Sequence, residues 1–236
     1  MDRLRDMKNI SFTQLVLTVL FVTALLISNT TAAKQVLLFG KITITSAEFI
    51  FPLTYVLSDV FSEVYGYRWS RLTCYLGFGA NLIMVLFFQM TIITPAPQYW
   101  AHQEAFKIVL GNTPRIWIAS MFAFLMGDLV NDKIFKRMKE KYANSHEKFW
   151  QRAIVSSFVG EIVDSSIFLP IAFIGQMPFK NLVTMMIFQT LVKTLYEVII
   201  LPITYKVVKI VSKIENSTKK HTHEVLYSFD NRQIRR

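Results

Sequence analysis

The stretch FIFPLTYVLSDVFSEVYGYRWSR at residues 49–71 decides the fold class. It continues an apolar run that starts at Ile42 and is long enough for a membrane helix, which needs about 20 mostly apolar residues. Asp59 and Glu63 are spaced to share one helix face, with Tyr55 one turn earlier. A carboxylate in hydrocarbon costs a few kcal/mol, so an acid within a membrane helix usually faces the interior of a helix bundle. The stretch therefore predicts a bundle with a polar interior, although Glu63 is close enough to the helix end to reach the lipid headgroups.

The overall composition indicates an integral membrane protein of one domain. The chain has 236 residues, of which 53% are hydrophobic, including 20 phenylalanines. Segments of about 20 largely apolar residues, the length that crosses a bilayer, occur at 12–31, 42–65, 71–93, 114–136, 153–176 and 180–206. We therefore expect an all-α membrane protein with six transmembrane helices. A cytosolic N-terminus at 1–11 precedes the transmembrane domain at 12–211, and a basic, disordered cytosolic tail follows at 212–236.

The positions of the basic residues predict the orientation in the membrane. Of the 26 lysines and arginines, 20 fall in four segments on one side, at 1–11, 65–71, 133–152 and 206–236. Five fall in the loops on the other side, and Lys193 lies within a span. Since cytoplasmic loops of membrane proteins are enriched in lysine and arginine, both termini are expected in the cytosol. This bias also explains the formal charge of +10, so no nucleic-acid partner is expected.

The sequence carries none of the common signatures of an enzyme or a metal site. The single cysteine, Cys74, can form neither an intrachain disulfide nor a cysteine metal cluster. The four histidines have no acid or cysteine at ligand spacing within a span, and the phosphate-loop, zinc-protease and serine-hydrolase motifs are missing. We expect no catalytic residue, no metal and no cofactor.

The last two spans place charged residues near the middle of the membrane. Glu161 and Asp164 lie at i and i+3 in the fifth span, and Gln189, Lys193 and Glu197 lie at i, i+4 and i+8 in the sixth. Lys193 could pair with an acid to form an ion-pair lock that binds no ligand. The three acids outnumber this one lysine, however. The surplus must therefore be protonated, hydrated, or bound by a ligand that offers hydrogen-bond donors.

Acids and amides among many aromatic residues suit a small planar ligand rich in donors. A guanine-type ring presents an N–H and an exocyclic NH₂ side by side, and one carboxylate can accept both. Phenylalanine and tyrosine faces can stack on such a ring. The same arrangement would also suit a cationic amine or a vitamin with an amide edge.

Residues 49–71 and the fifth-span segment GEIVDSSIFLPIAF resemble the queuosine precursor transporter family, also called vitamin uptake transporter-like proteins. The resemblance covers nearly all of residues 12–215. It implies import of 7-cyano- or 7-aminomethyl-7-deazaguanine, or queuine, across a bacterial inner membrane for tRNA modification. The matching positions for which it implies substrate binding are Asn29, Tyr55, Asp59, Glu63, Glu161, Asp164, Gln189, Lys193 and Glu197.

Two other functions remain open at this level. A substrate-binding subunit of an energy-coupling vitamin importer also has six spans, but it would need partner ATPases and a coupling membrane protein. A non-transporting structural membrane protein would use its mid-membrane charges only as ion-pair locks. The partners expected for the transporter are a small-molecule deazaguanine and membrane lipid, with a homo-oligomer also compatible with the sequence.

Overall fold

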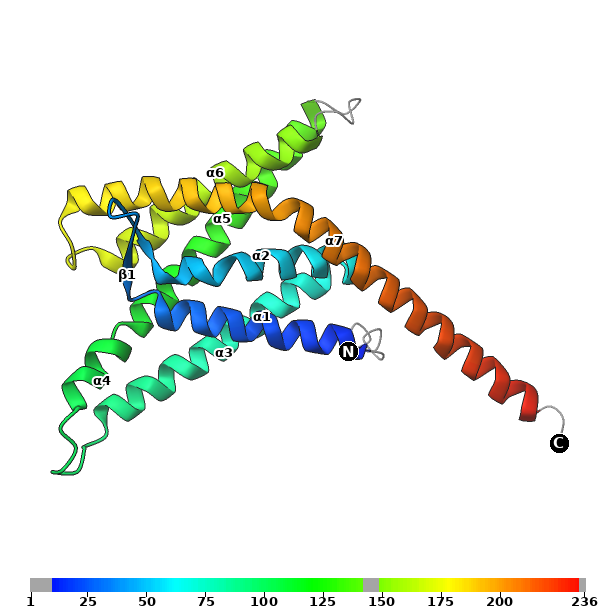
Figure 1. Ribbon diagram of the computed structural model, residues 1–236, viewed down its shortest axis with the longest axis horizontal. Helices are drawn as coiled ribbons and strands as arrows, with labels where there is room; N and C mark the ends of the chain where they lie inside the picture. Colours follow the sequence, from blue (N-terminus) through cyan, green and yellow to red (C-terminus); the bar gives the residue numbers. More distant parts are fainter. Residues whose placement is uncertain (1–9, 142–148, 234–236) are drawn as a thin grey trace.

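The computed structural model describes residues 10–141 and 149–233, and these are mostly helical (Figure 1). Within them, five stretches are long and apolar enough to cross a membrane: Phe12–Thr31, Tyr67–Ile93, Gln103–Asn131, Ile154–Phe173 and Phe179–Ser217. They correspond to helices α1 (Phe12–Thr31), α3 (Tyr67–Ile93), α4 (Gln103–Leu110) with α5 (Thr113–Lys141), α6 (Phe149–Phe173) and α7 (Phe179–Gln233). The fold is that of a helical, multi-pass membrane protein.

The prediction of one continuous helix at 42–65 is wrong. This segment contains a strand, a 3-10 helix, an α-helix and a π-helical turn in succession. Strand β2 (Ile42–Thr45) pairs antiparallel with β1 (Gln35–Leu38), and the 3-10 helix η2 (Ser46–Phe49) follows. The four residues of β2 are all β-branched, which favours a strand, and Gly40 supplies the positive φ that the hairpin turn requires. Helix α2 (Phe51–Val60) and the π-helical turn η3 (Phe61–Tyr65) come only after this hairpin. Together they measure roughly 22 Å at 1.5 Å per residue, which is shorter than a membrane core of about 30 Å.

Helix α2 runs through the middle of the bundle. It contacts α1 on one side and α7 on the other, while α1 also packs against α3, and α6 packs against both α5 and α7. The start of α1 and the far end of α7 lie toward the same end of the molecule (Figure 1). The β hairpin and the start of α7 lie at the opposite end. The polar face of α2 is thereby directed among the other helices.

Helices α5 and α6 approach closely through two glycines. A Cβ atom on Gly127 would lie 3.1 Å from the carbonyl oxygen of Gly160 and 3.2 Å from Cβ of Asp164. A Cβ atom on Gly160 would lie 3.1 Å from Cβ of Asn131. Small residues at a helix crossing allow membrane helices to pack backbone to backbone. This crossing sets the position of Asp164 relative to α5.

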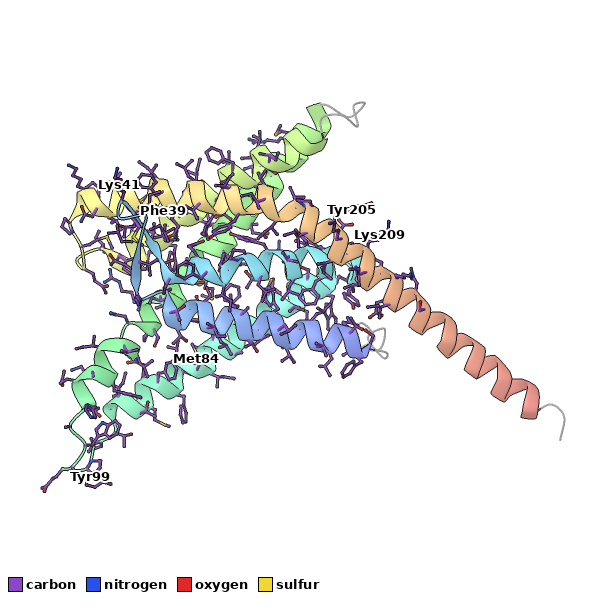
Figure 2. The ribbon with its side chains drawn as sticks, in the orientation of Figure 1. Phe39, Lys41, Met84, Tyr99, Tyr205 and Lys209 are labelled. Atoms are coloured by element: carbon purple, nitrogen blue, oxygen red, sulfur yellow. The ribbon has the colours of Figure 1, made fainter. Side chains whose placement is uncertain are left out.

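Exposed aromatic and basic side chains mark the two ends of the bundle (Figure 2). Phe39 and Lys41 project from the hairpin, and Tyr99 projects from the loop before α4. Tyr205 and Lys209 are exposed on the part of α7 that lies away from the hairpin. Aromatic side chains of this kind gather at the two membrane–water interfaces, so the positions of these five residues fit a membrane between the two ends.

Helix α7 is longer than the predicted sixth span. It contains Pro202 and bends in its orange part, as the missing N–H and the ring of a proline dictate (Figure 1). A disordered tail was expected from residue 212, whereas the structure has helix as far as Gln233. No glycine or proline occurs after Pro202, and the lysines and glutamates there have good helix propensity, so nothing local ends the helix.

Candidate functional site

A cavity of about 370 Å³ lies among the helices, at the low end of the range for small-molecule pockets, about 300–1,000 Å³. Its walls come from α1, α2, η3, α3, α5, α6 and α7, and they combine carboxylates, hydroxyls and aromatic rings. The ionisable and aromatic lining residues are Asp59, Asp128, Glu161, Asp164, Glu197, Arg71, Cys74, Phe21, Phe51, Tyr55, Tyr67, Phe78 and Phe124. The cavity can therefore offer both hydrogen-bond acceptors and stacking surfaces to a ligand.

Lys193 holds two of the lining carboxylates from behind the cavity wall. Its side chain is 4% exposed and is not part of the lining. Its Nζ lies 2.5 Å from Oδ2 of Asp164 and 3.2 Å from Oε2 of Glu161. The hydroxyl of Tyr55 donates a hydrogen bond to Oε1 of Glu161, and the Phe51 ring lies 4.9 Å from the Lys193 ammonium. These contacts fix the two acids in place.

Glu48 belongs to the same electrostatic cluster, and it lies in the segment 42–65 that was expected to form one continuous helix. Its side chain on η2 is only 2% exposed, and it interacts electrostatically with Lys193, Glu161 and Asp164. The hairpin that replaces the start of the expected span brings η2 against α1 and α2. The buried Lys193 ammonium is thus within electrostatic range of three carboxyl groups and contacts two of them directly, Asp164 and Glu161.

A second ion pair forms part of the cavity wall between α3 and α5. Nη2 of Arg71 lies 2.5 Å from Oδ2 of Asp128, and both side chains are about three-quarters buried, at 21% and 29% exposure. Nε of Arg71 donates to the hydroxyl of Tyr67 at 2.7 Å, and the guanidinium carbon lies 5.0 Å from the Tyr67 ring centroid. Neither Arg71 nor Asp128 was among the predicted binding residues. The available signal was the position of Arg71 at the end of the stretch 49–71, one helical turn after Tyr67.

Five of the nine predicted site residues line the cavity, namely Tyr55, Asp59, Glu161, Asp164 and Glu197. The other four lie outside the lining. Asn29 is buried and donates to Oδ1 of Asn81 at 3.0 Å, which ties α1 to α3. Gln189 is fully buried, and its Oε1 accepts from the backbone N–H of Thr45 at 3.4 Å, which ties α7 to the hairpin. Glu63 is exposed on η3, and Lys193 lies behind the wall.

The described lining carries more negative than positive groups. It contains five carboxyl groups, against the guanidinium of Arg71 and the ammonium of Lys193 behind it, which leaves three acids beyond the cations. Asp59 and Glu197 form no ion pair with any described residue. Within the described residues, no group of three or more histidine, cysteine, aspartate or glutamate side chains is arranged to hold a metal ion. The surplus acids therefore suit an organic ligand with several N–H donors or a positive charge.

Comparison with known proteins identifies the family of this chain. A family model described as "Putative vitamin uptake transporter" matches residues 45–207, which include every cavity residue except Phe21 and Leu25. A curated protein of Bacillus subtilis (strain 168), named "Probable queuosine precursor transporter", is 26% identical over 191 residues, covering 81% of this chain and 82% of the relative. No solved structure matches the chain. The chain is a membrane transporter that belongs to the vitamin uptake transporter family, in which the queuosine precursor transporters are found.

Proposed function

We propose that this transporter imports queuosine precursors across a bacterial inner membrane for tRNA modification. Its substrates would be 7-cyano- or 7-aminomethyl-7-deazaguanine, or queuine, and it would act without catalysing a reaction. The observation that carries the proposal is the cavity in which five carboxyl groups and six aromatic rings converge. A deazaguanine ring has a donor edge for a carboxylate and flat faces for aromatic side chains.

Glu197 is the carboxylate best placed to take the donor edge of the ring. Glu161 and Asp164 are already held by Lys193, and Asp128 is held by Arg71. Glu197 lines the cavity, is only partly exposed, and forms no ion pair with a described residue. A ring whose N–H and NH₂ groups both donate to Glu197 would satisfy this carboxylate without moving either ion pair.

We also propose that the segment 42–65 completes a sixth crossing, with α2 and η3 supplying its helical part. The hairpin and η2 would cover the remaining depth. Both termini would then lie in the cytosol, as the 20-to-5 distribution of basic residues requires. The exposed apolar faces of the long helices would contact lipid.

Uptake in cells tests the proposal. A bacterial strain that cannot make 7-cyano-7-deazaguanine is supplied with each precursor, and queuosine is measured in its tRNA. We expect the wild-type chain to restore queuosine and Glu197→Gln to reduce it, while Glu104→Gln, the same change on the exposed face of α4, leaves it intact. No restoration by the wild type, despite confirmed membrane expression, would favour an energy-coupled subunit and a search for its partners.

A further inference from the structure

The charges around the cavity distinguish between two of the proposed substrates, the 7-cyano and the 7-aminomethyl deazaguanines. The 7-cyano form is neutral, whereas the 7-aminomethyl form carries an ammonium group at neutral pH. Two of the surplus acids, Asp59 and Glu197, come from different helices and line the same cavity, Asp59 at an exposed position and Glu197 at a partly buried one. Neither forms an ion pair with a described residue. A cavity with excess carboxylate charge favours a bound cation, because opposite charges attract more strongly where surrounding protein lowers the effective dielectric constant below that of water.

The aromatic walls add to this preference. Phe51, Tyr55, Phe78 and Phe124 line the cavity, and the face of an aromatic ring attracts an ammonium group. The Phe51 ring already lies 4.9 Å from the Lys193 ammonium, so this wall tolerates a positive charge. By contrast, the two cations near the cavity are both engaged with acids and do not create a positive patch.

We propose that the cavity selects the cationic 7-aminomethyl form through Asp59 and Glu197, and that the membrane potential drives its import. This inference rests on the proposed function. A monovalent cation that crosses alone gains free energy from an inside-negative potential, and about 100 mV is equivalent to an accumulation of about 50-fold. No co-transported ion is needed for such accumulation. The neutral form would only equilibrate across the membrane.

The test uses the purified full-length chain in liposomes that carry a potassium diffusion potential set with valinomycin. Each labelled compound is first measured in counterflow without a potential, and then in net uptake at about 100 mV, inside negative. We expect counterflow of both compounds, and potential-driven accumulation approaching 50-fold for the aminomethyl form alone.

Binding assays on variants test the two acids. Asp59→Asn and Glu197→Gln should each lower the preference for the aminomethyl form by about tenfold. This is the effect expected for removing one unit charge about 10 Å away at an effective dielectric constant of about 20. Glu104→Gln, an equal change in net charge outside the cavity lining, should preserve it.

The outcomes separate the inference from the function on which it rests. Counterflow of both compounds with no response of the aminomethyl form to the potential would overturn the inference and leave the proposed function standing. Equal responses of the two compounds would overturn it as well. If neither compound exchanged, the proposed function would fail and the inference with it. The midpoint of thermal unfolding of each variant, measured beside the wild type, shows whether the variant is folded, and the wild-type comparison of the two compounds does not depend on any variant.

Discussion

Replacing Lys193 with methionine should destabilise the protein strongly, because two buried carboxylates lose their common cation. The Lys193 side chain is 4% exposed, and its ammonium lies 2.5 Å from Asp164 and 3.2 Å from Glu161, so little water can replace it. Removing one partner of a buried ion pair costs about 3–5 kcal/mol. At about 2–4 °C per kcal/mol for a domain of this size, the midpoint of thermal unfolding should fall by roughly 6–20 °C. Methionine keeps the length and apolar character of the side chain, so the loss reports mainly on the charge.

Thermal unfolding of the purified protein in detergent measures this effect. Lys180→Met, the same substitution at an exposed position in the first turn of α7, serves as the control and should change the midpoint little. Adding Asp164→Asn to Lys193→Met should recover part of the loss, since one of the unpaired charges is then absent. A fall of less than about 2 °C for Lys193→Met, well under the range expected from a buried pair, would refute the reasoning that this lysine holds the cluster together.

Two further predictions concern the helix contacts around the cavity. Gly127→Val should lower both stability and uptake, since its Cβ would lie 3.1 Å from a backbone oxygen of α6, and overpacking costs about 1–3 kcal/mol. Gly79→Val, where a Cβ meets nothing within 4 Å, should leave the unfolding midpoint unchanged, and equal effects of the two changes would contradict this view of the crossing. Arg71→Gln should cost about 1–3 kcal/mol, between the values for exposed and fully buried pairs, and should slow counterflow. A second change, Asp128→Asn, should restore part of both quantities; if it worsened them instead, the two residues would not act as a pair.

Hydropathy predicted the long helices well, because a stretch of about 20 apolar residues has few stable alternatives to a membrane helix. It failed at residues 42–50, which alternate apolar residues with Thr43 and Thr45 and then contain Ser46 and Glu48. The hairpin there depends on β-branched side chains in β2, on the positive φ of Gly40, and on the packing of β2 against α7. Average hydropathy contains none of this backbone information.

Sequence spacing predicted which residues of the candidate site share a face of one helix, but not which residues of different helices meet. The positions of Glu161 and Asp164 on one face of α6, and of Lys193 on α7, suggested an ion pair, and the structure has this pair. The pairing of Arg71 with Asp128 depends on how α3 and α5 are rotated against each other, which the sequence of neither helix reveals. Glu48 entered the cluster only because the hairpin carries η2 into the bundle.

The most direct test of the proposed binding site is an experimental structure of the full-length protein in lipid nanodiscs with bound 7-aminomethyl-7-deazaguanine. We predict that the ring lies in the cavity among α2, α3, α5, α6 and α7, with its N–H and NH₂ edge on a lining carboxylate, Glu197 in the first place, and with Lys193 still paired behind the wall. A ligand bound outside this cavity, or one whose donor edge meets no carboxylate, would contradict it.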